Sequence, residues 1–592
     1  MKFISLQKIL WAFALVLTTT YNANSQAFST FNTSIAGFAQ GGCDWGDYDK
    51  DGYVDVVLSG ILPNNQPGTK LFKNNAGTFS EVNTGIAELK NGTVRFGDYD
   101  NDNDLDILVC GQNSNFEAFT LIYRNDNGSF AKMNHGFFGV YNGVAVFGDY
   151  DNDGFLDVLV TGDSLSYTPV TELYKNNGDN TFSVVNQQFV PLISSSATFG
   201  DYDNDGDNDI LLCGDYSGMY VSKLYRNDNG IFAEAPVQFE GLGAGNAVFI
   251  DFDKDNDNDL FMLGNDMTLT PNFKIYRNDG LNIFTEVSAG VTGLALGNLA
   301  VADYNNDGYP DFAATGKAAG CGATATFIYF NNQQGSFWQE AVSLQSMSYS
   351  RVAWGDMDND GDPDLLLMGA NSSGNSETIV YRNNSGINSF VAHQSPPVPD
   401  GMQTTVDGDR VTFSWNRPVT VPPQSISLTY NLRIGINPGK MEVMAPYVNL
   451  QSGYSKLPVT GNTSCDTSWT IGNLREGEYF WSVQAVDHSF GTSAFSTEGS
   501  FTIELTGQLE PNTADVSVYP NPFTNQLNIR TVDIGAEVSK ISLINAAGQI
   551  VLETETTGSL LTLNTARLSK GLYILRVTNQ KHEYTYSLIC KD

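Results

Sequence analysis

The chain has 592 residues, and its 41% hydrophobic and 12% aromatic content is enough to pack several domain cores, which excludes a largely disordered polypeptide. Its formal net charge is -35, from 31 basic and 66 acidic residues. This acidity excludes nucleic acid or an anionic membrane face as the main partner, because both require clustered lysine and arginine.

Residues 1–25 predict a secretory signal peptide. Lys2 and Lys8 precede an apolar run at residues 9–17, and a stretch of small polar residues with a cleavage site after Ser25 follows it. The apolar run is too short to favour a membrane-spanning helix, and no later segment approaches the ~20 apolar residues that a span needs. We therefore expect an exported mature chain without a transmembrane segment.

Six cysteines are spread thinly along the sequence, without a CxxC motif or a pairing with histidine, so neither a disulfide framework nor a zinc site is indicated. Cys110 and Cys213 end the similar apolar runs "DILVC" and "DILLC". At such positions a free cysteine acts as a small apolar residue, so both side chains are predicted to be buried.

An acidic motif recurs seven times, at intervals of 50 to 53 residues between its first aspartates. The seven copies read "GDYDKDGYVDV", "GDYDNDNDLDI", "GDYDNDGFLDV", "GDYDNDGDNDI", "IDFDKDNDNDL", "ADYNNDGYPDF" and "GDMDNDGDPDL". We call the nine residues from the first to the last aspartate of each copy an aspartate loop: loops 1 to 7 are residues 47–55, 98–106, 149–157, 201–209, 251–259, 303–311 and 356–364.

Each aspartate loop has side-chain oxygens at positions 1, 3, 5 and 9, and 27 of these 28 residues are aspartate, Asn305 being the exception. Together with the backbone carbonyl of position 7, they match the hard oxygen ligands that Ca²⁺ prefers. Position 6 is glycine in five loops and asparagine at Asn103 and Asn256, the residue types that reach positive φ most cheaply. The candidate calcium ligands are Asp47, Asp49, Asp51, Tyr53 and Asp55; Asp98, Asp100, Asp102, Asp104 and Asp106; Asp149, Asp151, Asp153, Phe155 and Asp157; Asp201, Asp203, Asp205, Asp207 and Asp209; Asp251, Asp253, Asp255, Asp257 and Asp259; Asp303, Asn305, Asp307, Tyr309 and Asp311; and Asp356, Asp358, Asp360, Asp362 and Asp364.

These loops differ from an EF-hand, which places a bidentate glutamate at position 12 and a helix on each side. Here position 12 is apolar in all seven copies, and each loop runs into strand-like sequence such as "LDILVCG". The sequence therefore predicts calcium loops that each connect two β-strands.

The rest of each repeat also predicts β-structure. A second shared phrase, for example "KLYRNDNGIF", consists of an apolar strand, an Asn/Asp/Gly turn and a phenylalanine that opens another strand. Each repeat of ~51 residues thus carries about four short strands, which is the layout of one propeller blade. Residues 28–395 are predicted to form an all-β, seven-bladed propeller.

The "FGDYDNDGxxDLL…LYRNxG" form of these repeats resembles the FG-GAP and VCBS repeats of integrin α-subunit propellers and of many bacterial secreted proteins. The resemblance implies about seven structural Ca²⁺ ions, one in each loop, held by positions 1, 3, 5 and 9 and by the position-7 carbonyl. Two segments compete to complete the ring as an outer strand, "FSTFNTSIAGF" at residues 28–38 and "SFVAHQ" at residues 389–394.

A proline-rich break, "QSPPVPDG", precedes a second predicted domain at residues 398–505. Its alternating segments, such as "EYFWSVQAV", predict a sandwich of about seven short strands. The segment resembles a fibronectin type III domain, a fold in the immunoglobulin-like class. The resemblance implies that Trp415 lies in the core and that Tyr479 takes the place of the corner tyrosine.

Residues 513–592 form the last predicted domain, a small β-sandwich. They contain "VSVYPNPFTNQLNI" and the strand-like "GLYILRV" at residues 571–577, which resemble the C-terminal sorting domain of the type IX secretion system. The resemblance implies transport across a bacterial outer membrane, the type IX translocon as a partner, and a secreted or cell-surface location.

The sequence favours a non-catalytic binding or adhesion module for an extracellular glycan or protein that it does not identify. It contains no G-x-S-x-G, H-E-x-x-H or glycine-rich phosphate motif, and of its four histidines only His135 lies in the body of the predicted propeller. Seven copies of one aspartate cluster favour structural ions, because a catalytic site needs a single asymmetric constellation. The alternative is a secreted carbohydrate-active enzyme, a polysaccharide lyase or hydrolase with catalytic loops on the propeller face.

A basic residue that precedes the hairpin asparagine in six repeats is predicted to have a structural role within its blade. Ligand-binding residues are expected instead in the variable segments "ILPNNQPGT", "DSLSYTPVT" and "GKAAGCGATAT". The six basic residues are Lys73, Arg124, Lys175, Arg226, Arg277 and Arg382.

Overall fold

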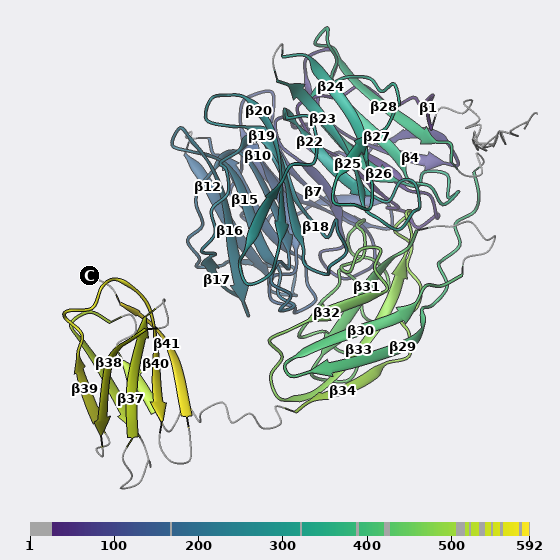
Figure 1. Cartoon of the computed structure of the whole chain (residues 1–592). Coiled ribbons are helices and arrows are strands. Elements are labelled where there is room, and N and C mark those ends of the chain that lie inside the picture. The colour runs from purple at the N-terminus through teal and green to yellow at the C-terminus, as the bar shows by residue number, and fades with distance from the viewer. Residues whose placement is uncertain are drawn as a thin grey trace, which may run out of the picture. The chain divides into compact units, whose positions relative to one another are not determined.

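The computed structural model shows a chain of strands and loops (Figure 1), and it divides into two units, Met1–Ile503 and Glu504–Asp592. It describes residues 27–165, 168–319, 322–385, 390–419, 427–504, 516–519, 523–531, 539–545, 549–556, 560–578 and 583–590. The predicted signal peptide, Cys321 and residues 520–522 of the predicted sorting domain lie outside the described residues. No helix long and apolar enough to cross a bilayer occurs in the part of the chain that is described.

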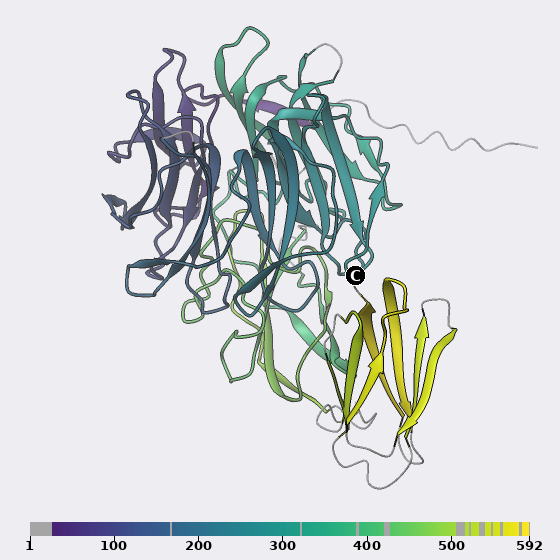
Figure 2. The same cartoon turned by 90° about the vertical axis from the view of Figure 1, so that its left-hand side faces the viewer.

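Seven antiparallel blades of four strands follow the seven repeats, as predicted, and Figure 2 shows them arranged side by side; one pairing, Asn272↔Leu294, joins blades 5 and 6 into a single sheet. Blades 1 to 3 consist of β2 (Cys43–Gly46), β3 (Asp55–Ile61), β4 (Pro67–Asn75) and β5 (Thr78–Val82); β6 (Val94–Gly97), β7 (Asp106–Gln112), β8 (Ala118–Asp126) and β9 (Ser129–Lys132); and β10 (Tyr141–Gly148), β11 (Asp157–Asp163), β12 (Pro169–Asn176) and β13 (Phe182–Val184). Blades 4 and 5 consist of β14 (Ile193–Gly200), β15 (Asp209–Tyr216), β16 (Met219–Asp228) and β17 (Ile231–Glu234); and β18 (Gly243–Ile250), β19 (Asp259–Asn265), β20 (Pro271–Asn278) and β21 (Phe284–Val287). Blades 6 and 7 consist of β22 (Leu294–Ala302), β23 (Asp311–Ala318), β24 (Thr324–Asn331) and β25 (Phe337–Gln339); and β26 (Ser348–Gly355), β27 (Asp364–Ala370), β28 (Ser376–Asn383) and β1 (Phe28–Phe31).

The N-terminal strand completes the ring. β1 pairs with β28 in the register Phe28↔Asn383 to Phe31↔Val380, so it forms the outer strand of blade 7 (Figure 1). Phe390, from the competing segment, instead packs its ring 5.8 Å from that of Phe31. The N-terminal strand and the last repeat are therefore held in one sheet.

The second strand of each blade is buried almost throughout, because neighbouring blades cover both of its faces. In β3 and β7, for example, six of the seven residues are buried. Cys110 and Cys213 lie in such strands with 0% and 5% of their surface exposed, which confirms their predicted burial.

An asparagine in the third strand of every blade connects that blade to the preceding one. In blade 3, the side-chain amide of Asn176 donates to the carbonyl oxygens of Tyr99 in blade 2 (2.8 Å) and Leu156 (3.1 Å), while its own oxygen accepts from Gly178 N (3.0 Å). Asn74 donates in the same way to Met357 O (2.9 Å), so the link also spans the junction between blades 7 and 1. The seven residues are Asn74, Asn125, Asn176, Asn227, Asn278, Asn331 and Asn383.

Asn176→Ala is expected to lower the free energy of unfolding by about 3 kcal/mol, because it leaves buried carbonyl and amide groups without partners. Asn177→Ala is the matched control: Asn177 is the next residue, is exposed and bonds only within its own hairpin, so it should cost less than about 1 kcal/mol. Chemical denaturation in excess calcium measures both, and equal losses in the two variants would contradict the link between blades.

Two three-stranded sheets form the next part of the first unit. One contains β29 (Asp400–Asp407), β30 (Arg410–Asn416) and β32 (Ser468–Ile471), and the other β31 (Thr429–Gly435), β33 (Gly477–Val486) and β34 (Gly499–Ile503). We call this part the sandwich. Trp415 lies in its core with 5% of its surface exposed, as predicted, and the Tyr479 hydroxyl donates to Arg475 O (2.8 Å), the contact that a corner tyrosine makes. Six strands are described where about seven were predicted.

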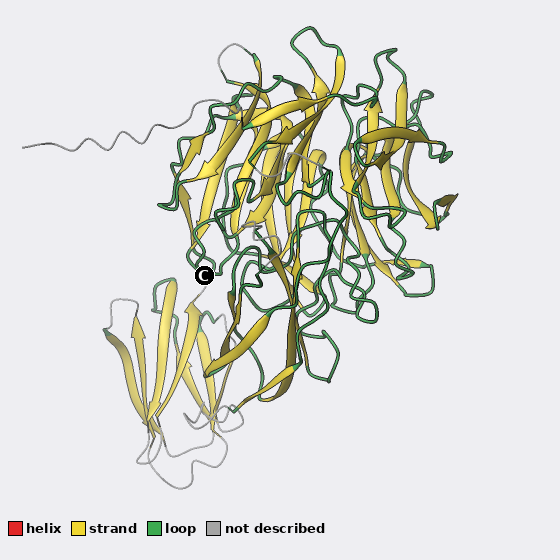
Figure 3. Cartoon of the chain, turned by 90° about the vertical axis from the view of Figure 1, so that its right-hand side faces the viewer, coloured by secondary structure: helices red, strands yellow, loops and turns green. Residues whose placement is uncertain are grey.

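The second unit is also built from two antiparallel sheets (Figure 3). One contains β35 (Val516–Tyr519), β36 (Gln526–Thr531) and β39 (Leu560–Asn564). The other contains β37 (Ser539–Asn545), β38 (Ile550–Thr556), β40 (Gly571–Thr578) and β41 (Glu583–Cys590). The predicted strand at residues 571–577 corresponds to β40, and its Tyr573, Leu575 and Val577 lie in the core with Phe523.

Candidate metal centres

Each aspartate loop connects the first and second strands of its blade and folds around its own first aspartate. In loop 4, the Asp201 carboxylate accepts from the amides of Asp205 (3.2 Å) and Gly206 (2.9 Å). Asp209, fully buried at the start of β15, accepts from Tyr202 N (2.8 Å) and Asn227 N (2.8 Å). The two ends of the loop are thereby held close together.

The fold brings carboxylates from the predicted set within reach of one ion. In loops 1 to 4, oxygens of the aspartates at positions 1, 3 and 9 all lie within 4.8 Å of one another, and in loop 5 the corresponding group is Asp251, Asp253 and Asp255. The position-5 aspartates of loops 1 to 4 do not belong to these groups of three. The three-residue groups of loops 1 to 4 are Asp47, Asp49 and Asp55; Asp98, Asp100 and Asp106; Asp149, Asp151 and Asp157; and Asp201, Asp203 and Asp209.

One oxygen in six of the loops fits a site that could hold a cation. Wherever position 3 is an aspartate, its Oδ1 is buried and accepts no hydrogen bond from the described residues. A buried carboxylate oxygen without a donor is costly, and a bound cation would satisfy it. The donor set, all oxygen and largely carboxylate, fits Ca²⁺. The six residues are Asp49, Asp100, Asp151, Asp203, Asp253 and Asp358.

Burial also makes these carboxylates hard to ionise without a cation. Desolvation, together with like charges in the same loop, raises the pKa of Asp47 to about 6, of Asp98 to about 7 and of Asp157 to about 9. A dication in the loop would reverse this effect and hold the carboxylates ionised.

The turn at position 6 has the predicted backbone conformation. Gly206 has φ 93°, and the two asparagines that replace glycine, Asn103 and Asn256, have φ 70° and 74°. Position 4 also has positive φ in all seven loops, between 55° and 63°, which the sequence analysis did not predict. The position-4 residues are Lys50, Asn101, Asn152, Asn204, Lys254, Asn306 and Asn359.

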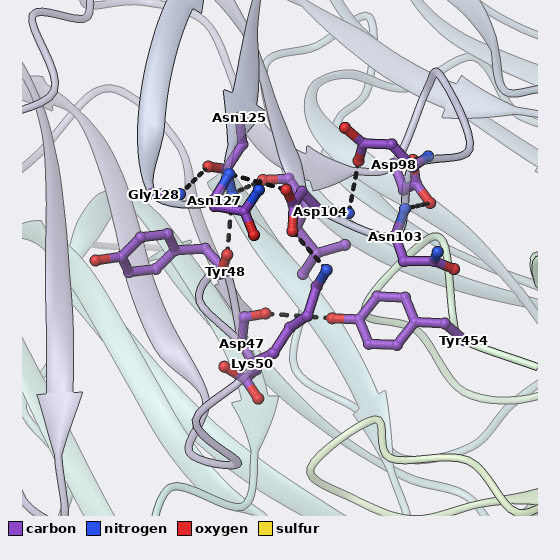
Figure 4. Close-up of polar contacts among 12 residues, drawn as sticks. Asp47, Tyr48, Lys50, Asp98, Asn103, Asp104, Asn125, Asn127, Gly128 and Tyr454 are labelled. Atoms are coloured by element: carbon purple, nitrogen blue, oxygen red, sulfur yellow. Dashed lines mark hydrogen bonds and ion pairs between the residues drawn. The ribbon is translucent and has the colours of Figure 1, made fainter. Parts of the chain in front are cut away.

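These position-4 side chains link each loop to the next around the ring. Asn204, for example, donates to Asn256 O (2.8 Å) and to the Asp257 carboxylate (2.6 Å) in loop 5. Lys50 pairs with Asp104 of loop 2 at 2.5 Å (Figure 4), and Asn359 of loop 7 donates to Gly52 O of loop 1 at 2.7 Å. The remaining links are Asn101 to Gly154 O (3.1 Å), Asn152 to Gly206 O (3.2 Å), Lys254 to Gly308 O (2.9 Å) and Asn306 to Gly361 O (3.3 Å).

The six repeated basic residues pair with acids of their own blades, which agrees with a structural role. Lys73 contacts Asp49 and lies 2.9 Å from Asp51. Lys175 and Arg382 likewise contact aspartates of their own aspartate loops. The other three pair with the hairpin aspartate two residues later: Arg124 with Asp126 (2.8 Å), Arg226 with Asp228 (2.5 Å) and Arg277 with Asp279 (2.6 Å).

The sandwich covers the end of the propeller that carries the aspartate loops, which we call the loop end. Its Lys456, only 3% exposed, contacts Gly154 O in loop 3, and its backbone carbonyl accepts from Asp98 N in loop 2 (2.8 Å). All seven loops make such a contact. The others are Tyr454 Oη to Asp47 O (3.3 Å, Figure 4), Asn449 Nδ2 to Asn101 O (3.0 Å), Gly472 N to Asn204 O (3.0 Å), Asp466 with Lys254 (2.8 Å), Ser427 N to Asn306 Oδ1 (2.5 Å) and Ser489 Oγ to Asn359 Oδ1 (2.6 Å).

The opposite end of the propeller, the open end, carries the turns between the second and third strands. The first strand of each blade ends at its aspartate loop, so the antiparallel second strand leads away from the loop end. The variable segments at residues 61–69, 163–171 and 316–326 all contain such turns. At the same end, where the first strands begin, residues of all seven blades line one cavity of about 400 Å³.

His135 lies among aromatic rings, 5.5 Å from Tyr99 and Phe137 and 4.9 Å from Phe182 by ring centroids. Desolvation lowers its pKa, so the side chain stays neutral near pH 7. The side chain is half-buried, and no carboxylate among the described residues forms a hydrogen bond with its ring.

Comparison with known families matches two parts of the chain. Five overlapping segments match the FG-GAP-like repeat, at residues 47–109, 98–160, 149–212, 201–262 and 251–314. Each begins at the first aspartate of one loop and runs through the following loop, so loops 1 to 6 are covered. Residues 517–591 match the secretion system C-terminal sorting domain. No curated protein matches the chain.

Two solved structures are similar over most of the chain at low identity. The extracellular domain of a hybrid two-component system from B. thetaiotaomicron aligns with 96% of this chain at 9% identity and a TM-score of 0.35, and the chain spans 59% of that protein. PorZ, a surface component of the type-IX secretion system of Porphyromonas gingivalis, aligns with 93% of this chain and 75% of its own at 11% identity and a TM-score of 0.24.

Proposed function

From a chain that carries FG-GAP-like repeats and a type IX sorting domain, and that is therefore exported to the cell surface or secreted, we propose a calcium-stabilised, non-catalytic binding module. About seven Ca²⁺ ions hold the aspartate loops, and the open end of the propeller binds an extracellular glycan. Residues 28–395 form the binding domain, residues 398–505 a fibronectin type III-like domain, and residues 513–592 the sorting domain that the type IX translocon reads.

The observation that carries this proposal is the difference between the two ends of the propeller. At the loop end, the sandwich contacts all seven aspartate loops, so this surface is already occupied. The open end carries the turns of variable sequence and a cavity to which every blade contributes. Concave sites of this size that combine apolar and polar groups are where proteins bind small ligands or chain ends.

The position-3 oxygens support a structural role for the calcium. Each lies buried inside its own aspartate loop, at the opposite end of the propeller from the open end, and the same arrangement recurs in six blades. A bound ion there would keep its carboxylate ligands ionised and coordinated. Such carboxylates would stabilise the fold and would not transfer protons.

A glycan array with the mature chain tests the proposal. We expect binding to a restricted set of glycans in calcium, loss of that binding when a chelator unfolds the propeller, and no change in the glycans afterwards. The control is the isolated C-terminal segment from residue 504, which lacks the open end and should bind none of them. Release of unsaturated oligosaccharides from plant or algal polysaccharides would contradict the proposal and support a lyase.

A further inference from the structure

The cavity at the open end lies where the first strands of all seven blades begin, so it lies on the propeller axis. Six of its lining residues are Gln40, Asn91, Asn142, Ser194, Tyr349 and Arg351, contributed by blades 1, 2, 3, 4 and 7. The first five have positive φ, between 47° and 57°. Hydrogen bonds connect neighbours around the mouth: Asn91 N donates to Gln40 O (2.6 Å) and Gln40 N to Tyr349 O (2.9 Å).

Arg351 is the one charged side chain among the described residues that line this cavity. Its Nη1 donates to Ser350 O (3.1 Å), and no carboxylate of the described chain lies within ion-pair distance of its guanidinium. Since a guanidinium carries five donors, most of them are left for a ligand. In a chain with twice as many acidic as basic residues, an arginine in a cavity without an acid partner is a notable exception.

A second guanidinium reinforces the positive charge on the axis. Arg95 in β6 lies near enough to Arg351 that, after desolvation, it is the next cause of the fall in the Arg351 pKa to about 10. Arg351 therefore remains charged at neutral pH. Asp44 lies 3.9 Å from Arg95, and burial raises the pKa of this carboxyl to about 6, so it is still largely ionised near pH 7 and neutralises one of the two cations. Two guanidiniums and one carboxylate leave a net positive charge beside the cavity, which favours the binding of an anion.

The other lining groups suit a sugar. Asn91, Asn142 and Gln40 offer amides and Ser194 offers a hydroxyl. Tyr349, 40% exposed, offers an aromatic ring, over one face of which the Lys317 ammonium lies 5.5 Å from the centroid. Amide and hydroxyl groups match the alternating donors and acceptors of sugar hydroxyls, and a cavity of about 400 Å³ has room for one or two sugar rings.

We propose that this axial cavity binds a carboxylate-bearing sugar residue, with the carboxylate on Arg351 and the ring against Tyr349. The proposal rests on the glycan-binding function above and names its ligand class. A planar carboxylate can accept two parallel hydrogen bonds from a guanidinium. The strong net negative charge of the chain disfavours a long polyanion across the surface, so the ligand enters as a free sugar acid or as the end of a chain.

Isothermal titration calorimetry of the full mature chain in excess calcium tests this site. The probes are D-glucuronate, D-galacturonate, D-glucose, acetate and inorganic phosphate, with a galacturonate trimer to distinguish a chain end from a free acid. We expect a sugar acid to bind at least about tenfold more tightly than glucose, acetate or phosphate, and Arg351→Gln to weaken that binding at least about tenfold. A trimer that binds as tightly as the monomer identifies a chain end.

Two variants serve as controls. Arg124→Gln removes a partly exposed arginine at the loop end and should leave sugar-acid binding unchanged. Tyr349→Ala alters the mouth of the cavity without touching a buried charge, so it tests the same site should Arg351→Gln fail to fold, and it should weaken binding several-fold.

Equal binding of acetate, phosphate and sugar acids would overturn the proposal, and so would sugar-acid binding that neither Arg351→Gln nor Tyr349→Ala changes. Array binding of neutral glycans that survives Arg351→Gln would overturn the acid site and leave the proposed function in place. A chain that binds no array glycan but binds a sugar acid through Arg351 would support the site and contradict the broader glycan function.

Discussion

Chelation of calcium is expected to lower the melting temperature of the propeller by more than about 10 °C. A ligand that binds only the folded state stabilises it by about 2.7 kcal/mol at a concentration 100 times its Kd, and seven such sites together would exceed the ~5–15 kcal/mol that holds most domains folded. Without the ions, the buried position-3 oxygens would also lack any partner. Differential scanning calorimetry with calcium and with excess EGTA measures the effect.

Magnesium provides the matched control for this experiment. It demands a near-octahedral site and gives up its water reluctantly, so adding it to the chelated protein should restore much less of the lost stability than adding calcium. The calcium-loaded protein should contain about seven ions per chain by elemental analysis. A melting temperature that EGTA leaves unchanged would refute the calcium sites.

Asp209→Ala is expected to be the most damaging single substitution in loop 4, with a loss of about 4 kcal/mol. The substitution removes a proposed calcium ligand. It also leaves the buried amides of Tyr202 and Asn227, which donate to this carboxylate, without an acceptor. The number of bound calcium ions should fall by one.

Asp228→Ala is the control within the same blade. Asp228 lies outside the aspartate loop and pairs at 2.5 Å with the partly exposed Arg226, so its loss should cost less than about 1 kcal/mol and leave the calcium content unchanged. If both variants lose one ion, or if Asp209→Ala keeps them all, the assignment of Asp209 as a ligand is wrong.

Features that depend on local sequence could be predicted. One repeat of ~51 residues contains the aspartate loop, its turn at position 6 and the four strands of a blade. Because this pattern recurs seven times, it could not be a chance match. Which strand closes the ring could not be decided from the sequence, because β1 and "SFVAHQ" are both short apolar segments. The pairing of Phe28 with Asn383 in the structure decides between them.

Features that depend on contacts between repeats were missed. Asn176 has the sequence context of a hairpin turn, and it does bond to Gly178, but its link to Tyr99 joins residues 77 positions apart. Position 4 of the loops is lysine in two copies and asparagine in five, and nothing in the sequence gives it a partner in the next loop. Arg351 lies in "SYSRVAWGD", where nothing in the sequence indicates that the side chain reaches a cavity on the axis.

The contacts between the sandwich and the aspartate loops could not be predicted from the sequence either. Tyr454, Lys456 and Ser489 come from loops between its strands, and such polar residues are ordinary on any surface. Only the fold shows that they contact the backbone and the position-4 side chains of the aspartate loops. The proposed calcium sites and the attachment of the sandwich therefore involve the same segments.

The pairing of β1 with β28 has a consequence for how the protein matures. The two ends of the ring are joined by contacts such as that between Ser29 and Asn384, which are 355 residues apart, so a nascent chain holds an unpaired first strand until the last repeat is made. Contacts this distant form slowly, and an open edge strand invites pairing with other chains. Truncation of the seventh repeat, or a tag that displaces Phe28–Phe31, should therefore yield aggregates and not a smaller propeller.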